Sequence, residues 1–316
     1  MAETPADSLR VDDAWILSRR GPRNAVDPRR PYAFLVEPEH TAGGRVEDVG
    51  TIFITNRECP FRCLMCDLWK NTTINRVPAG SVAEQISFAI LNMPPVRHLK
   101  LYNSGNFFDE KAIRRSDLPA IVNMVRNHET VIVESHPKLV DGRCTAFARQ
   151  LRGRFQVAMG LETVDPDVLP RLNKRMTLDD YARAAAFLTS HDIDVRAFIL
   201  LRAPFQSEEA GEHWAKRSIE WAFSNGVECC AVIPTRAGNG AMETLATLGH
   251  FEPPSLAALE RVHRYGLSLG NGRVFVDLWD AEKFSGGPED DQRIKRMAAM
   301  NLSQRIAADG DAGGAA

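Results

Sequence analysis

The sequence predicts an α/β fold in which helices cover a parallel sheet. Short runs rich in β-branched and aromatic residues recur along the chain from residue 51, and helical patterns lie between them. Because such alternation joins parallel strands through right-handed crossovers, six strand–helix units could close most or all of a β/α barrel. An open doubly wound sheet fits the same pattern. In both architectures we expect the reactive groups at the carboxyl ends of the strands.

Seven short strands are predicted. Each is bounded by turn residues or by the start of a helix, as expected for strands in an alternating α/β chain. They cover residues 51–55, 98–102, 130–134, 155–159, 195–200, 227–233 and 273–276.

Capping patterns mark the predicted helices between these strands. Residues 81–84 have the sequence of a capping box, and the helix that follows should end before Pro94. Residues 177–180 carry a second cap. Further helices are predicted after Asp117 and from 207 to 226, where acidic residues begin the helix and Asn-Gly ends it.

The two ends of the chain differ from this central pattern. Residues 1–44 are predicted to form an arm, because arginines and prolines occur there without a regular apolar period. We expect a solvated arm, although its arginines could contact phosphates. Residues 45–285 should form the core domain. Residues 286–316 should add a helix and a Gly/Ala-rich tail that is disordered beyond Asp309. The arginines of the arm are Arg19, Arg20, Arg23, Arg29 and Arg30.

The composition is that of an ordinary globular protein. The chain has 316 residues, 44% hydrophobic and 25% charged, and its net charge of −2 gives no global attraction to nucleic acid or to an anionic membrane. The polar start lacks the apolar run of a secretion signal, and no stretch is long enough to cross a membrane. We therefore expect a cytoplasmic protein whose six cysteines stay reduced.

Three of these cysteines lie close together, directly after the first predicted strand. Cys59, Cys63 and Cys66 have the spacing C-x3-C-x2-C on a loop at the carboxyl end of that strand. A structural zinc site would need a fourth ligand, for which Asp67 or His98 could serve, although neither completes a familiar zinc spacing. Disulfides would leave one thiol over. A four-iron cluster normally has four thiolates, so three would leave one iron open to another ligand.

The other cysteines carry a different expectation. Cys144 lies in a helical pattern, and Cys229 and Cys230 lie in a predicted strand. Because free cysteine is commonly a small core residue, we expect all three to be buried and to bind no metal.

The cysteine motif and the segments at the other strand ends resemble the radical S-adenosylmethionine (SAM) superfamily. Within it the chain resembles the branch of the elongator catalytic subunit and the tRNA methylthiotransferases, and most of all the radical subunit of archaeosine synthase. The resemblance implies a partial (β/α)6 barrel of radical SAM type, a [4Fe-4S] cluster on Cys59, Cys63 and Cys66, and bound SAM. The further segments that carry it are 102–109, 134–137, 160–163, 173–177 and 200–205.

The resemblance also implies which residues contact SAM. Two residues after the second of the predicted strands match backbone that contacts the methionyl amine, where a glycine lets the backbone approach a ligand closely. Two acidic residues match positions that face the cofactor, and two arginines could meet its carboxylate or a substrate acid. These positions are Ser104 and Gly105, Glu134 and Glu162, and Arg175 and Arg202.

Three features depart from the superfamily pattern. Met65 stands where an aromatic residue usually packs near the adenine, and Glu58 precedes the first cysteine where a small residue is usual. The cysteine-bearing end of archaeosine-type relatives is not evident after Asp280.

The reaction implied by the resemblance needs an external reductant such as flavodoxin or ferredoxin. Reductive cleavage of SAM would yield a 5′-deoxyadenosyl radical, which takes hydrogen from a small-molecule, peptide or tRNA-linked substrate, for instance a modified nucleoside, in a lyase- or transferase-type reaction. Two alternatives stay open: a zinc-stabilised, non-catalytic RNA-binding or scaffold protein, and a cluster used only for electron transfer.

Overall fold

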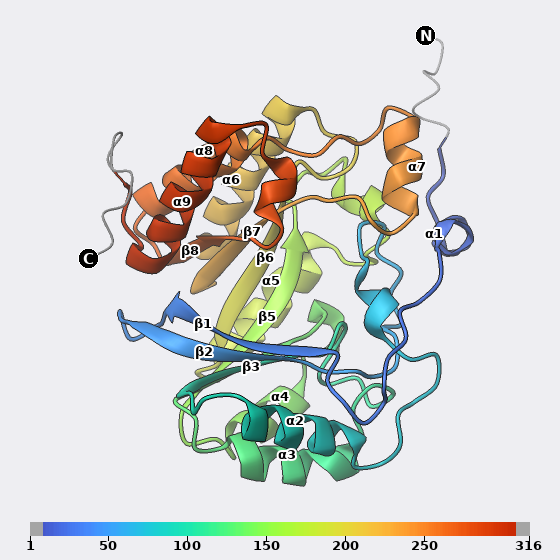
Figure 1. The fold of residues 1–316 in the computed structure, drawn as a ribbon, viewed down its shortest axis with the longest axis vertical. Coiled ribbons are helices and arrows are strands. Elements are labelled where there is room, and N and C mark those ends of the chain that lie inside the picture. Colours follow the sequence, from blue (N-terminus) through green and yellow to red (C-terminus); the bar gives the residue numbers. More distant parts are fainter. Residues whose placement is uncertain (1–8, 308–316) are drawn as a thin grey trace.

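Eight strands form one sheet in their order along the chain (Figure 1). The structure is a computed structural model that describes residues 9–307. β1 pairs antiparallel with β2, and the strands from β2 to β8 are parallel, which confirms the α/β class and the partial barrel. The bounds are β1 Ala33–His40, β2 Val46–Phe53, β3 His98–Tyr102, β4 Thr130–Glu134, β5 Arg154–Glu162, β6 Asp194–Leu201, β7 Cys229–Pro234 and β8 Arg273–Val276.

Most of the α-helices pack on the outer face of this curled sheet, whereas α1 and α7 pack against each other to one side of it. Figure 1 shows α2, α3 and α4 grouped against one part of the sheet and α6, α8 and α9 against another. The α-helices are α1 Asp13–Arg19, α2 Ser81–Asn92, α3 Leu118–Val125, α4 Gly142–Ala148, α5 Leu178–Thr189, α6 Glu208–Ser224, α7 Ala241–Thr247, α8 Leu256–Ser268 and α9 Pro288–Ser303. Short 3-10 helices are η2 Leu68–Asn71, η3 Arg115–Asp117, η4 Pro137–Leu139, η5 Leu169–Leu172 and η6 Ala281–Phe284.

Alternate strand residues build the core between sheet and helices. Leu99 and Leu101 of β3 and Val131 and Val133 of β4 are fully buried in one apolar cluster with the inner faces of α2 and α3. Residues between them, such as Lys100, face the concave side of the sheet. No helix among residues 9–307 combines the length and apolar character needed to cross a membrane.

The two predicted capping boxes have different outcomes. At α5 the Thr177 hydroxyl accepts from Asp180 N–H at 3.1 Å, and the Asp180 carboxylate accepts from Thr177 N–H at 3.0 Å, as predicted. The box predicted at 81–84 is wrong. Gly80 caps α2 with a positive φ of 80°, and its N–H donates to the Asp117 carboxylate. Ser81 is itself helical and fully buried.

The amino-terminal segment differs from the predicted solvated arm. From residue 9 onward it contributes α1 and the edge strand β1, and its arginines meet partners on the body of the protein. Arg29 pairs with Glu84 at 2.6 Å, and the Arg30 guanidinium lies over the Phe88 ring. The proposed division at residues 44 and 285 stays a prediction, and the predicted disorder beyond Asp309 falls outside the described residues.

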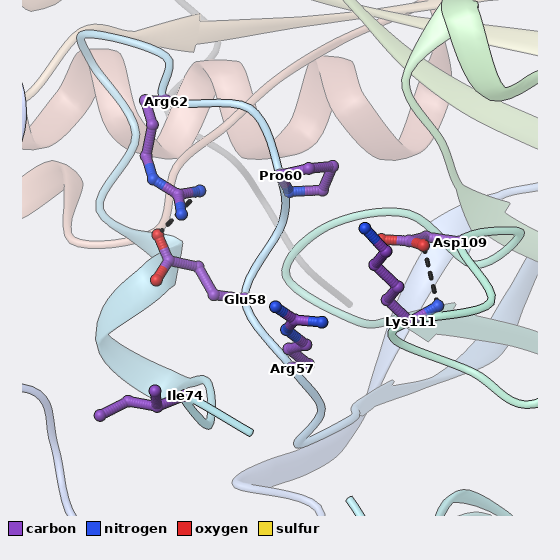
Figure 2. Close-up of a pocket in the computed structure, with 7 residues that line it drawn as sticks. All are labelled: Arg57, Glu58, Pro60, Arg62, Ile74, Asp109 and Lys111. Carbon is purple, nitrogen blue, oxygen red and sulfur yellow. Dashed lines mark hydrogen bonds and ion pairs between the residues drawn. The ribbon is translucent and has the colours of Figure 1, made fainter. Parts of the chain in front are cut away.

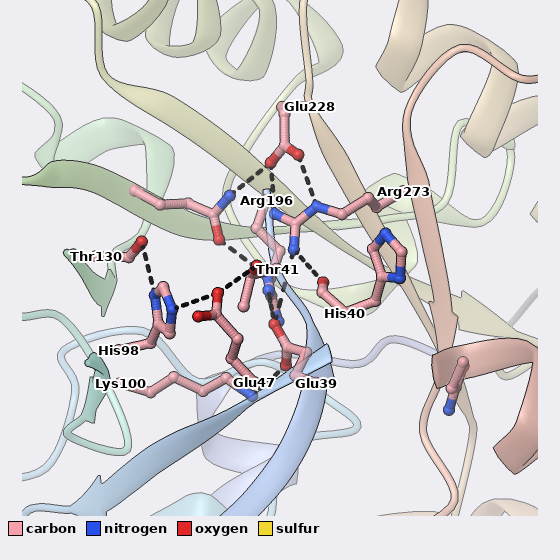
Figure 3. Close-up of polar contacts among 12 residues, drawn as sticks. Glu39, His40, Thr41, Glu47, His98, Lys100, Thr130, Arg196, Glu228 and Arg273 are labelled. Atoms are coloured by element: carbon pink, nitrogen blue, oxygen red, sulfur yellow. Dashed lines mark hydrogen bonds and ion pairs between the residues drawn. The ribbon is translucent and has the colours of Figure 1, made fainter. Parts of the chain in front are cut away.

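Charged side chains close the barrel at the end where the parallel strands begin (Figure 3). Glu39 of β1 binds Lys100 of β3 and Arg196 of β6, each at 2.5 Å, and all three are largely buried. Arg273 of β8 pairs with Glu228 at 2.7 Å. The antiparallel strand β1 thus supplies the carboxylate that neutralises Lys100 and Arg196, whose side chains point to the inside of the barrel from the parallel strands.

Candidate metal centre

The three clustered cysteines lie on the loop after β2, at the end of the sheet opposite the charged cluster. All three are free thiols of intermediate exposure. Burial raises the pKa of Cys59 to about 11 and the pKa values of Cys63 and Cys66 to about 12. The thiols are therefore protonated at neutral pH on their own, and binding a metal or cluster would release protons.

The spacing of the sulfurs argues against a single zinc ion. A tetrahedral zinc with Zn–S bonds of about 2.3 Å holds its sulfurs roughly 3.8 Å apart. Among residues 9–307, the trio whose donor atoms all lie within 4.8 Å is Glu47, His98 and Glu129, not the cysteines. Arg97 pairs with both of these glutamates and Arg45 pairs with Glu47, so two arginines already balance the charge of that trio. His98, considered above as a zinc ligand, bonds to Glu47 at 3.2 Å at the far end of the sheet.

Backbone and amide contacts hold the cysteine loop from several sides. Leu64 N–H donates to Leu172 O at 2.9 Å. The Asn239 amide donates to Leu64 O at 2.7 Å and to Cys66 O at 3.2 Å, and Asn173 donates to Arg62 O at 2.7 Å. A loop tied this way keeps its cysteines in place before any ligand binds.

Glu58, the residue that departs from the superfamily pattern, anchors the amino-terminal segment to this loop. Its carboxylate accepts from Arg20 at 2.6 Å and from Arg23, and it lies 3.1 Å from Arg62. Burial opposes its ionisation, but the hydrogen bonds from Arg20 and Arg23 outweigh burial and lower the pKa of Glu58. The acidic residue beside Cys59 is therefore the counter-charge for three arginines.

Three of the predicted SAM contacts lie together beside Cys59. Gly105 N–H donates to Glu134 Oε1 at 3.1 Å, and a Cβ at Gly105 would sit 3.3 Å from the Cys59 Cβ. The Ser104 hydroxyl is 2.9 Å from the Tyr32 hydroxyl, and Ser104 has a positive φ of 53°. Burial raises the pKa of Glu134 to about 7.

Glu162, a fourth predicted contact, is paired with a lysine. Lys174 Nζ lies 2.6 Å from Glu162 Oε1, and both side chains are buried. A Cβ at Gly160 would collide with both groups, so glycine makes the room for this pair. Burial disfavours the ammonium, but the Glu162 carboxylate outweighs it and raises the pKa of Lys174. The charge of Lys174 in turn favours the thiolate of Cys63.

The two predicted arginines are engaged elsewhere. Arg175 pairs with Asp13 of α1 at 2.5 Å and is half exposed. Arg202 bonds to Glu208 at 3.0 Å and to Pro253 O at 2.8 Å. Arg175 thus contacts α1, and Arg202 contacts the segments that begin α6 and precede α8.

Two polar residues near the cysteines escaped the sequence analysis as site residues. The Asn106 amide donates to Cys59 Sγ at 3.2 Å, and Asn106 Oδ1 accepts from His136 N–H at 2.5 Å. The His136 ring stacks on Phe61 of the cysteine loop with centroids 3.7 Å apart. Burial and then the Lys174 charge lower the pKa of His136 to about 3, so the imidazole is neutral. Asn106 and His136 both fall in segments that carry the family resemblance. Their contacts, however, join residues from different strand ends, which the sequence pattern of one segment does not reveal.

A row of aromatic rings lines the concave side of the sheet. Phe53 of β2 lies 5.6 Å from Tyr32 and 6.4 Å from Tyr102, and Tyr102 lies 6.2 Å from Phe198 of β6. Trp279, after β8, is 6.5 Å from Phe53 and 57% exposed. Strand alternation alone could have identified Phe53, Tyr102 and Phe198 as one face.

The remaining cysteines lie in the protein interior, as predicted. Cys144, Cys229 and Cys230 are fully buried. Cys144 and Cys230 belong to the main apolar cluster.

The residues around the cysteine loop suit a group larger than one metal ion. The three thiols are not all within reach of one small ion, and the Asn106 amide donates to Cys59 Sγ. Because Gly105 has no side chain, its backbone is accessible beside Cys59. This donor set fits a [4Fe-4S] cluster with three protein ligands.

Sequence comparisons relate the chain to archaeal proteins, and no family model matches it. It is 20% identical over 250 residues to an uncharacterized protein of Methanocaldococcus jannaschii, covering 74% of this chain and 68% of that protein. Two proteins named archaeosine synthase subunit beta also match. The one from Thermococcus kodakarensis is 30% identical over 38% of this chain, and the one from Methanosarcina acetivorans is 28% identical over 52%. The matches span 39% and 50% of their lengths.

Solved structures share the fold. Methylornithine synthase (PylB) superposes with a TM-score of 0.50 at 17% identity, covering 75% of this chain and 66% of that one. The radical S-adenosylmethionine methyltransferase TsrM of Kitasatospora setae, with cobalamin and a [4Fe-4S] cluster bound, has a TM-score of 0.45 at 15% identity and covers 62% and 36%.

Proposed function

Because the chain resembles the radical SAM enzymes in fold and the archaeosine synthase subunits beta in sequence, we propose that it is a radical SAM enzyme. Cys59, Cys63 and Cys66 would hold a [4Fe-4S] cluster, and SAM would bind its fourth iron. The observation that carries the proposal is the loop of three separated thiols after β2 with Gly105 and Glu134 directly beside it.

The chain's own residues have distinct tasks in this proposal. When bound, the cluster and SAM together would supply a 5′-deoxyadenosyl radical that abstracts a hydrogen atom from the substrate. Glu134 and the backbone at Ser104 and Gly105 would bind the amino group of SAM. Glu162 would accept from its ribose hydroxyls, while the ion pair with Lys174 holds the Glu162 carboxylate in place. Asn106 would donate to a ligand sulfur, which stabilises negative charge on the cluster.

Arg175 and Arg202 remain candidates for a carboxylate of SAM or of the substrate. Each would have to exchange a present ion pair, with Asp13 or with Glu208, for the ligand's acid group. Charge-assisted pairs of arginine with a carboxylate are strong enough for such an exchange when the site excludes water.

For the substrate we propose a modified nucleoside, free or within tRNA, in a lyase- or transferase-type reaction. Two observations support it: the relatives named archaeosine synthase subunit beta, and the aromatic row ending in the exposed Trp279. Nucleobases stack well on such rings. A small-molecule or peptide substrate is the alternative.

Anaerobic reconstitution with iron and sulfide tests the cofactor assignment. We expect a brown protein with about four irons per chain that releases 5′-deoxyadenosine from SAM with dithionite, measured by liquid chromatography and mass spectrometry. Cys63→Ala should lose both properties, whereas the control Cys144→Ala should keep them. Stoichiometric zinc without iron or sulfide would instead support the scaffold protein, and a cluster without cleavage of SAM would support pure electron transfer.

A further inference from the structure

A cavity of about 360 Å³ lies at the cysteine loop (Figure 2). Its lining includes Glu58 and Pro60, the two neighbours of Cys59 in the chain. Neither Gly105 nor Glu134 lines it, nor does any ring of the aromatic row. The cavity is therefore separate from the residues proposed to bind SAM and substrate, although it is lined by both chain neighbours of Cys59.

Two cations in this cavity have free charges. Arg57 and Lys111 both line it, and neither side chain has a hydrogen bond or ion pair with another residue between 9 and 307. Of the two acidic residues in the lining, Glu58 is already shared by three arginines. Asp109 accepts from the backbone N–H of Lys111 at 2.9 Å. The cavity thus presents positive charge that the fold leaves unpaired.

Apolar surface adjoins these cations. Ile74 lines the cavity with 70% of its surface exposed, and Pro60 is exposed as well. Transient protein interfaces combine such apolar contacts with charged residues that steer the partner to its orientation.

We propose that this cavity is the docking point for an acidic electron-donor protein of the flavodoxin type. The inference rests on the proposed function, which requires a reductant for the cluster. Carboxylates of the donor would pair with Arg57 and Lys111, and its redox group would approach Cys59 across Pro60. The lining favours a protein over a nucleic acid, since the exposed Ile74 and Pro60 suit an apolar partner surface, which a phosphate backbone does not offer.

The test compares reduction of the reconstituted protein by two reductants. The variant Arg57→Glu/Lys111→Glu is matched with Arg152→Glu/Lys295→Glu, which makes the same charge change at two exposed residues that do not line the cavity. Cluster bleaching is followed by anaerobic stopped-flow absorbance, once with dithionite and once with an acidic flavodoxin in its hydroquinone form. Binding of that flavodoxin to each cluster-loaded variant is measured in parallel by thermophoresis.

We expect the reversal variant to react with flavodoxin at least tenfold more slowly at low salt and to bind it correspondingly more weakly. Dithionite should reduce every variant at the same rate, and the matched control should stay within twofold of the unchanged protein. Added salt should slow the unchanged protein, because it screens the attraction, and should speed the reversal variant, because it screens the repulsion.

Several outcomes would overturn the docking site. One is an unchanged rate of reduction by flavodoxin in the reversal variant. A second is that flavodoxin does not reduce the unchanged protein although dithionite does. A third is that the reversal variant loses binding to bulk tRNA while its reduction by flavodoxin is intact. A protein that neither takes up iron nor responds to dithionite would instead refute the proposed function itself.

Discussion

Lys174 Nζ lies 2.6 Å from Glu162 Oε1, in a buried ion pair next to the cysteine loop. Lys174 follows Asn173, whose amide holds Arg62 O, and its own carbonyl bonds to His136 Nε2 at 3.0 Å. This short segment therefore ties the fourth and fifth strand ends to the cysteine loop.

Breaking that pair should destabilise the protein strongly. Lys174→Met leaves the Glu162 carboxylate buried without a counter-charge, which costs about 3–5 kcal/mol. We expect this loss in the free energy of unfolding measured by anaerobic urea titrations. The double variant Glu162→Gln/Lys174→Met should recover much of it, and equal losses in single and double variants would contradict the assignment.

The ion pair between Glu162 and Lys174 should also require a glycine at position 160. A methyl group there would collide with Glu162 and Lys174, so Gly160→Ala should cost about 1–3 kcal/mol of stability. Gly142→Ala is the matched control, because a methyl group added at that position in α4 would meet nothing within 4 Å. Thermal unfolding should separate the two variants, and a neutral Gly160→Ala would disprove the crowding.

Glu134 should make stability fall as pH rises. Its folded pKa of about 7 lies above the ordinary value of 4.5, so the folded state binds the proton more tightly. The contribution is present below pH 4.5 and is lost as pH rises to about 7, by roughly 3 kcal/mol. Urea titrations across this pH range should show the slope in the unchanged protein and not in Glu134→Gln. Parallel curves for the two proteins would contradict it.

Removing Glu58 should release the amino-terminal segment. With Glu58→Ala, Arg20 and Arg23 lose their shared carboxylate, and we expect faster hydrogen exchange across residues 13–24. Iron uptake should fall because the cysteine loop loses an anchor. The exposed pair of Arg154 and Asp194 provides the control: Asp194→Ala should leave exchange in 13–24 unchanged.

The hydrogen bond from Asn106 to Cys59 should tune the cluster. A donor worth about 0.5–1.5 kcal/mol corresponds to roughly 20–60 mV for a one-electron couple. Asn106→Leu should therefore lower the reduction potential by that amount in an anaerobic titration followed by electron paramagnetic resonance. Asn123→Leu, a change of the same type on α3, should leave the potential where it is.

Much of the candidate site could be predicted from which residues stand at the carboxyl ends of the strands. Cys59 and Gly105 follow β2 and β3, and Glu134 is the last residue of β4. Because parallel strands bring their carboxyl ends to one edge, sequence order sufficed to place the three residues together. Lys174 and Asn106 were harder to recognise. Their roles depend on distances between side chains from different strand ends, which no local pattern encodes.

The failures of prediction also have physical reasons. β1 was missed because Pro38 and the glutamates at 37 and 39 are poor strand residues by propensity. They are tolerated because β1 is an edge strand and Glu39 meets buried cations. The cap at Ser81 failed because Gly80 adopts a left-handed conformation that starts the helix one residue earlier.

Glu39 also decides where the polypeptide can be shortened. A version starting at residue 45 would keep every parallel strand, yet Lys100 and Arg196 would remain in the barrel floor with their main anion gone. Such a truncation should yield insoluble material. Expression clones and fusion junctions for this protein therefore need to begin upstream of residue 33.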